Sequence, residues 1–111
     1  MTQAPPDALQ RAWGELYRAF LQRVDAGSSG VPIAAVTSWW RSRSRNASVG
    51  GAVYSQHLLG FALDLVTPKP AALVRALNAA GLFATDEGDH VHVQAFRAGA
   101  LPASLFSGLP T

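Results

Sequence analysis

The sequence predicts an α+β fold in which a small, mostly antiparallel sheet carries two helices packed on one side. Apolar residues at helical spacing indicate the helices, and short runs of branched and aromatic residues indicate the strands. With 111 residues the chain can build one core, whereas two halves of about 50 residues would each bury too little apolar surface. We therefore expect a single domain over residues 1–111.

The composition favours a packed globular body and restricts how a metal could be bound. Hydrophobic residues make up 49% of the chain and charged residues 14%, which argues against a disordered or fibrous protein. There is no cysteine, so a transition metal would have to be held by imidazole and carboxylate groups. The net charge of +2 permits only a weak preference for anionic partners.

The first ten residues contain no export signal. They include two prolines and an aspartate, but neither a basic segment nor an apolar one. No apolar run approaches the roughly 20 residues of a membrane helix. We expect synthesis in the cytoplasm, without a signal peptide or a membrane span.

The first helix is predicted over residues 7–26. Asp7 is the expected N-cap, and Gly27 suits the position just past the helix end, before a loop that runs to Gly30. Spacings of three and four place one apolar stripe on this helix, which we interpret as core packing. The stripe consists of Leu9, Trp13, Leu16, Phe20 and Val24.

A strand is predicted over residues 31–41, where branched and aromatic residues are frequent. Pro32 indicates that this strand begins at a sheet edge. Residues 41–51 are polar and contain glycine, which indicates a long loop rather than a helix or strand. Long loops inside compact domains are usually functional or mobile.

The second half of the chain supplies two further strands and a helix. In the strand predicted over residues 60–66, Asp64 shares one face with Ala62 and Val66. Pro70 opens a helix that Gly81 ends. After a turn at residues 86–88, a strand over 90–95 places His90, His92 and Gln94 on one face. The tail over 97–111 has no regular pattern.

The three histidines of the chain lie in two short segments, residues 55–64 and 89–92. Asp64 is the most informative residue nearby, because a carboxylate in an apolar strand is costly to bury without a partner. A zinc ion held by His57, Asp64 and His92 would satisfy it and leave a fourth position for water, as in catalytic zinc sites. The alternative is a salt bridge between Asp64 and an arginine such as Arg41.

These segments resemble the zinc D-alanyl-D-alanine metallopeptidases, a family of carboxypeptidases and phage endolysins that shares its fold with lysostaphin-type peptidases and the Hedgehog signalling domain. The family pattern Ser-x-His-x-x-Gly-x-Ala-x-Asp is present over residues 55–64 without insertion. Thr-Ser-Trp-Trp-Arg-Ser at 37–42 is similar to the family's Ser-Gly-Tyr-Arg-Ser segment. Asn46 with Val-Gly-Gly-Ala at 49–52, and Asp-His-Val-His at 89–92, match two further motifs. The resemblance covers about residues 36–95.

The resemblance implies a role for each matched residue. His57, Asp64 and His92 would bind one zinc ion, and Asp89 would act as the general base or acid. His90 would help to stabilise the oxyanion, while Arg41 would bind a substrate carboxylate or organise the site. We assign Ser55, with Arg41, to substrate binding, since a zinc mechanism needs no serine nucleophile.

Three neighbouring features leave alternatives open. By strict alternation Asp89 would point away from His90 and His92, so its role requires a chain that is still turning there; Glu87 or Asp86 could substitute. Of Trp39 and Trp40, one is expected in the core and the other beside a groove. Arg43 and Arg45 are interpreted as solvated loop charges.

The sequence as a whole predicts zinc-dependent hydrolysis of peptide bonds in bacterial peptidoglycan, by a carboxypeptidase or an endopeptidase. The protein is expected to be monomeric and, like phage lysis enzymes, to reach the cell wall after lysis or in a virion. The alternative is a zinc-containing binding module of the same fold that no longer hydrolyses anything. Nucleic-acid binding is disfavoured, because three clustered arginines and a net charge of +2 form no recognisable motif.

Overall fold

The computed structural model describes residues 2–111; Met1, which belongs to the segment predicted to lack an export signal, lies outside them. Four strands form one antiparallel sheet in the order β1-β2-β4-β3, with β1 Ala35–Ser38, β2 Ala62–Val66, β3 Phe83–Asp86 and β4 Val91–Gln94. The helices are α1 Asp7–Gly27, α2 Arg43–Ser48 and α3 Pro70–Ala79, with short 3-10 helices η1 Gln56–Leu59 and η2 Ala103–Phe106. The predicted α+β class is confirmed.

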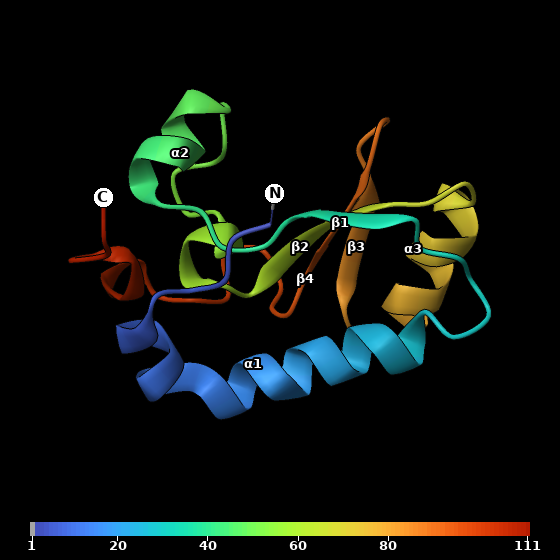
Figure 1. The fold of residues 1–111 in the computed structure, drawn as a ribbon, viewed down its shortest axis with the longest axis horizontal. Coiled ribbons are helices and arrows are strands. Elements are labelled where there is room, and N and C mark those ends of the chain that lie inside the picture. Colours follow the sequence, from blue (N-terminus) through green and yellow to red (C-terminus); the bar gives the residue numbers. More distant parts are fainter. Residues whose placement is uncertain (1) are drawn as a thin grey trace.

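Figure 1 shows how these elements are arranged around the sheet. Helix α1 runs along one side of the molecule, α3 stands at one end, and α2 lies at the other end together with the C-terminal segment. Within residues 2–111, no helix is both long enough and apolar enough to cross a membrane.

The main core lies between one face of the sheet and the helices α1 and α3, as predicted. Alternate residues of β2 and β4 point into it, because successive side chains of a strand point to opposite faces. The buried residues of this cluster are Phe20, Val24, Leu63, Leu65, Leu73, Leu77, Leu82, Ala84, Val91 and Val93. The other face of the sheet therefore receives the remaining residues of the same strands, Asp64 and His92 among them.

Helix α1 differs from its prediction in its cap and in its buried face. The N-cap is Pro6, and Asp7 is the first helical residue, where its charge favours the helix dipole. Leu16 is 52% exposed, whereas Tyr17 is 3% exposed and takes its place in the core. Both positions fit helical spacing with Phe20 and Val24, so the spacing alone does not decide which of them faces the core. The helix also has a kink at Trp13, whose φ of −130° and ψ of 16° are not helical.

The segment after α1 corrects two sequence predictions. The strand expected over 31–41 is shortened to β1, which lies at the sheet edge. The polar stretch 41–51 is not a continuous loop, because it contains α2. Ser42 caps this helix by accepting a hydrogen bond from the Arg45 backbone N–H at 3.1 Å. With Asn46 as its one buried residue, α2 has no apolar periodicity that would predict it.

The second half of the chain follows the prediction except for one strand. Helix α3 begins at Pro70, and Gly81, with a φ of 86°, follows its end. Strand β4 occupies 91–94 within the predicted 90–95. Strand β3 was not predicted; it is four residues long and only Ala84 in it is buried, so its alternation is weak. The tail predicted as irregular contains η2.

A second buried cluster fixes η1 against α1 and the tail. It comprises Tyr17, Leu58, Leu59, Phe61, Phe106 and Leu109. The Tyr17 hydroxyl donates a hydrogen bond to the Leu59 carbonyl at 2.6 Å, and burial raises the pKa of Tyr17 to about 12, so it remains a donor. Gly60 ends η1 with a φ of 85°, in the left-handed region that favours glycine.

Replacing Gly60 should destabilise the fold more than replacing Gly88. Both have positive φ, but an added Cβ at Gly60 would lie 2.8 Å from Pro5 and 2.9 Å from Tyr17, whereas at Gly88 it would meet nothing within 4 Å. Gly60→Ala should therefore cost about 1–3 kcal/mol more than Gly88→Ala, the usual range for overpacking. Urea unfolding of both variants measures this; equal losses would contradict it.

Candidate metal centre

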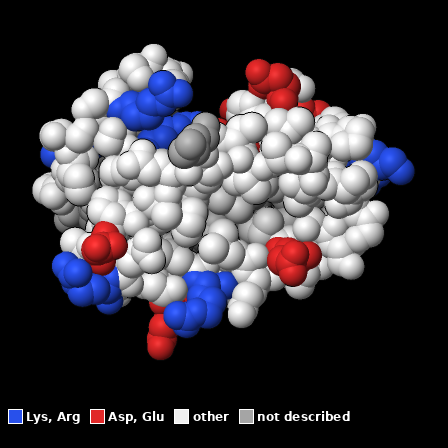
Figure 2. Space-filling model, in the orientation of Figure 1, with Lys and Arg blue, Asp and Glu red and all other residues white. Residues whose placement is uncertain are grey.

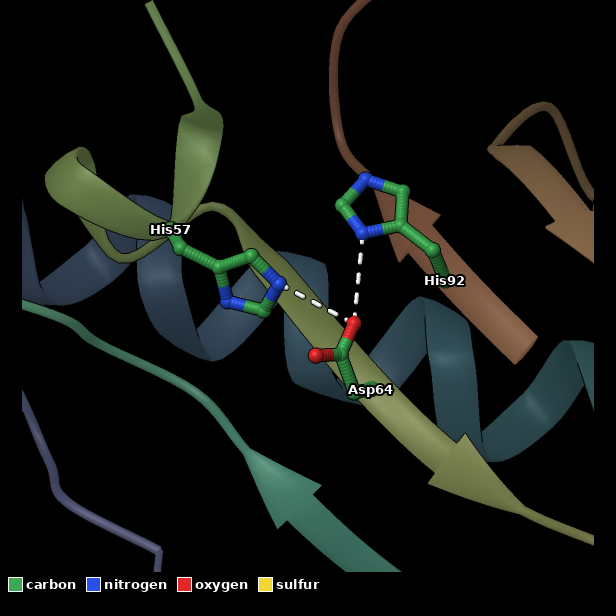
Figure 3. A group of neighbouring side chains, drawn as sticks. All are labelled: His57, Asp64 and His92. Atoms are coloured by element: carbon green, nitrogen blue, oxygen red, sulfur yellow. Dashed lines mark hydrogen bonds and ion pairs between the residues drawn. The ribbon is translucent and has the colours of Figure 1, made fainter. Parts of the chain in front are cut away.

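Three side chains from three elements converge on the face of the sheet opposite the main core. His57 comes from η1, Asp64 from the middle of β2, and His92 from the position of β4 directly opposite Asp64. Their nearest ligand atoms all lie within 4.8 Å of one another. Figure 3 shows both imidazole rings directed at the Asp64 carboxylate. The structure thus brings together the three residues predicted to bind zinc.

The orientation of His57 is set by a backbone carbonyl. Its Nδ1 lies 2.6 Å from the Trp39 carbonyl oxygen, which can only accept, so Nδ1–H is the donor. Its Nε2 lies 3.0 Å from Asp64 Oδ1, and the side chain is 1% exposed. Ser55 supports this arrangement, since its hydroxyl accepts a hydrogen bond from the His57 backbone N–H and caps η1.

The orientation of His92 is set by Gln94, two residues along the same strand face. Gln94 donates its amide to the Phe96 carbonyl at 2.9 Å, which leaves Oε1 as the acceptor facing His92 Nε2 at 2.8 Å. His92 therefore carries its proton on Nε2 when the ring is neutral. Its Nδ1 lies 3.3 Å from Asp64 Oδ1.

These hydrogen bonds leave lone pairs directed at one point. With both rings neutral, His57 Nε2, His92 Nδ1 and Asp64 Oδ1 are all acceptors and have no proton between them. Such an arrangement needs a cation, supplied either by protonating a ring or by a metal ion. Two imidazole nitrogens and one carboxylate oxygen, each oriented by a further hydrogen bond, are the donor set of open zinc sites. The residues present therefore fit zinc.

Asp64 contacts both Arg41 and the two histidines, so the two arrangements considered from the sequence occur together. Its Oδ2 lies 2.6 Å from Arg41 Nη2, while its Oδ1 faces the imidazoles. Burial alone would raise the pKa of Asp64, but hydrogen bonds to His57 and His92 and the nearby positive charges outweigh it and lower the pKa. The salt bridge considered as an alternative to metal binding is therefore present alongside the histidine cluster. Arg41 also donates to the Ser38 hydroxyl at 3.2 Å.

The acidic residues near His90 occupy different positions relative to the centre. The chain still bends at Asp89, as its predicted role requires, but the Asp89 side chain is 92% exposed and accepts a hydrogen bond from His90 Nδ1 at 2.6 Å. His90 Nε2 lies 3.7 Å from Asp64 Oδ1. Glu87 lines the cavity, with oxygens 3.9 Å from His90 and 4.0 Å from His92. Asp89 is thus connected to the centre through His90, whereas Glu87 faces it.

The three side chains open onto a cavity of about 900 Å³. One wall is formed by residues 49–56, which follow α2, and another by residues from 97 to 106 of the tail. A smaller cavity of about 330 Å³ shares Arg41 and Asp64 with the first and is also lined by Arg45. In Figure 2 basic side chains gather over α2 and acidic ones over the tip of the β3–β4 hairpin.

The remaining predicted residues lie close to this centre in supporting positions. Trp40 is buried and donates to the Leu58 carbonyl; Trp39 packs between the two core clusters and donates to the Gly60 carbonyl. Arg43 donates to the Leu109 carbonyl and so fastens α2 to the tail. Sequence reasoning gave no role to the Trp39 carbonyl or to the Gln94 amide; for Gln94, its place on the face of His92 was the available signal.

An α+β domain in which two imidazoles and a carboxylate meet at the floor of an open cavity has the site of a metal-dependent hydrolase. The family model described as Peptidase M15 matches residues 15–94, well over half of the chain. The chain therefore belongs to the Peptidase M15 family, whose peptidases are zinc-dependent, and its His57, Asp64 and His92 cluster could bind the metal. The resemblance drawn from the sequence motifs is confirmed. No curated protein and no solved structure matches the chain.

Zinc binding should depend on Gln94 as well as on the three ligands. Gln94→Ala should lower zinc affinity about 10–100-fold, because it frees the His92 ring, whereas His57→Ala should abolish tight binding. His90→Ala, which removes an imidazole from the same cavity, is the matched control and should retain one zinc ion. Calorimetric titration measures these affinities; loss of zinc in the control would show that the ligand set is wrong.

The metal-free protein should be most stable at mildly acidic pH. The pKa of His92 is raised, because its hydrogen bonds to Asp64 and Gln94 outweigh burial. The contribution of His92 to the free energy of unfolding is complete below its pKa in the unfolded chain, about 6.5. This contribution is lost as the pH rises through the higher pKa that His92 has in the folded protein. The pKa of Asp64 is lowered, so its contribution to the free energy of unfolding is present above the pKa of an unfolded aspartate, about 3.9. This contribution is lost as the protein is acidified.

The test is thermal unfolding of chelator-treated protein between about pH 3 and 9. Stability should fall on both sides of a maximum between about pH 4 and 6.5, and His92→Gln should remove the decline on the alkaline side. A stability profile that rises steadily to neutral pH would contradict the assignment.

Proposed function

We propose that the protein hydrolyses peptide bonds in the stem peptides or cross-links of bacterial peptidoglycan, as a carboxypeptidase or an endopeptidase. The observation that carries this proposal is the convergence of His57, Asp64 and His92 at the floor of a wide, open cavity. The wall-peptide substrate is supported by the motifs over residues 36–95, which resemble those of D-alanyl-D-alanine peptidases. Delivery to the wall by lysis or in a virion remains a prediction from the sequence.

The chain's own residues supply orientation and proton transfer. Zinc, when bound, would polarise the substrate carbonyl and provide a water molecule whose pKa is about 7. Arg41 would hold Asp64 in place by its 2.6 Å contact with Oδ2, so that Oδ1 stays directed at the centre. His90, with its Nε2 on the cavity side, would donate to the developing oxyanion when both of its ring nitrogens carry a proton, since its Nδ1 donates to Asp89.

Asp89 is the proposed proton-transfer residue. It occupies the matching position of the Asp-His-x-His motif, and it stands on an exposed bend, where rotation of a side chain is fast. The role requires that a change of its rotamer exchange the His90 contact for one inside the cavity. Glu87 already lines the cavity and is the competing candidate, because a carboxylate must come within hydrogen-bond reach of the proton that it accepts.

The test is the release of new amino groups from purified peptidoglycan. Native protein should release them, chelation should stop release, and added zinc should restore it. Asp89→Ala should bind one zinc ion but lose activity about 100-fold or more, the usual contribution of a general base, whereas Glu87→Ala should lose less. The masses of the products would identify the bond.

Two other outcomes would change the conclusion. If Glu87→Ala abolished activity while Asp89→Ala retained it, the proton-transfer role would pass to Glu87. If the zinc-loaded protein released nothing from several wall types, the chain would instead be a binding module of the same fold.

A further inference from the structure

The main cavity is lined by two arginines, and one of them lacks a carboxylate partner within residues 2–111. Arg41 is paired with Asp64 at 2.6 Å, and Glu87 lies within 4.0 Å of His90 and His92. Arg97 lines the same cavity at its exposed rim, and within residues 2–111 no carboxylate lies within 4.0 Å of it. Its guanidinium therefore adds an uncompensated positive charge to the cavity mouth.

The backbone next to Arg97 is fastened to the metal centre from two sides. Gln56, the neighbour of His57, donates its amide to the Phe96 carbonyl at 2.6 Å and accepts the Phe96 N–H at 3.1 Å. Gln94, which orients His92, donates to the same carbonyl at 2.9 Å. The residues that border or orient two of the metal-binding side chains thus also fix the position of the chain just before Arg97.

An aromatic ring also restrains the side chain of Arg97. Its guanidinium carbon lies 5.9 Å from the centre of the Phe83 ring on β3. This distance is near the outer limit of a cation–π contact, which leaves the N–H groups of the guanidinium free to bind a carboxylate. Arg97 is therefore restrained and retains unused donors, unlike an arginine that extends freely into water.

We propose that Arg97 is a specificity residue that binds a carboxylate of the peptide substrate while the scissile bond lies over the metal centre. The proposal rests on the proposed function and defines part of its substrate. Arg97 is the fifth residue after His92, so the two α-carbons are at most about 18 Å apart. The recognised carboxylate thus belongs to a residue near the reacting bond, either the C-terminal one or the α-carboxylate of a γ-linked glutamate.

The expected size of the effect follows from exposure. An ion pair with an exposed arginine is screened by water and contributes modestly, although a two-pronged contact strengthens it. Loss of Arg97 should therefore reduce kcat/KM about three- to tenfold, which corresponds to about 0.7–1.4 kcal/mol. The change should appear in KM rather than kcat, because Arg97 contacts a part of the substrate that does not react.

The experiment compares three pentapeptides of the sequence L-Ala-γ-D-Glu-L-Lys-D-Ala-D-Ala. One has both carboxylates free, one is amidated at the glutamate α-carboxyl, and one is amidated at the C-terminus. Steady-state kinetics would be measured for the zinc-loaded native protein, Arg97→Gln and Arg97→Lys. Arg75→Gln is the matched control, because Arg75 is exposed on α3 and does not line either cavity.

Arg97→Gln should raise KM for the unmodified peptide. It should have no effect on the peptide in which the recognised carboxylate is amidated, and that peptide identifies which of the two carboxylates Arg97 binds. Arg97→Lys should recover part of the loss, since it keeps the charge but not the planar fork. Equal changes for all three peptides, or the same change in Arg75→Gln, would overturn the proposal.

A binding measurement separates failure of this proposal from failure of the proposed function. If the native protein cleaves none of the peptides, calorimetric titration of the same zinc-loaded proteins with the peptides replaces the kinetics. Carboxylate-dependent affinity that is lost in Arg97→Gln would retain the role of Arg97 in a binding module. No binding, or binding unaffected by Arg97→Gln, would eliminate it.

Discussion

The site depends on one buried carboxylate whose two oxygens have different partners. The Oδ2 atom of Asp64 pairs with Arg41, and its Oδ1 atom faces the imidazoles of His57 and His92. Removing Arg41 would leave the buried Asp64 without its ionic partner, which costs several kcal/mol. Because Arg41 already neutralises Asp64, a divalent cation bound by Oδ1 and two neutral imidazoles would retain most of its positive charge. Such a centre attracts anionic groups, as a peptidase requires for the charge that develops on the substrate oxygen.

The fold keeps this arrangement rigid by orienting each ring through a hydrogen bond on its far side. The Trp39 carbonyl orients His57, and the Gln94 amide orients His92. Trp39 in turn is held by the Gly60 carbonyl and by packing between the two core clusters. The aromatic core therefore supports the metal centre directly, and the ligands are positioned before any ion binds.

The sequence predicted the metal centre, because the residue types found there have few other physical explanations in an apolar setting. A carboxylate within an apolar strand and histidines confined to two segments indicated the three converging side chains, because few other arrangements satisfy them. The pattern did not predict α2, whose single buried residue is the polar Asn46, or β3, where one buried alanine leaves too little alternation. The burial of Tyr17 in place of Leu16 could not be read from the periodicity, because both positions lie at helical spacing from Phe20. The contacts of the Trp39 carbonyl and of Gln56 arise only from tertiary packing.

The cavity takes its floor from the sheet and two of its walls from segments outside the sheet. Residues 49–56 and the tail from residue 97 form these walls, while two of the three metal-binding side chains stand on β2 and β4. Loops tolerate changes of length and composition far better than a packed sheet does. The architecture thus partly separates chemistry from selectivity. Insertions or deletions in either wall would change the outline of the cavity without moving β2 and β4, although His57 follows the first wall directly on η1. Proteins built in this way can acquire new substrates while the strands that hold the reactive centre remain unaltered.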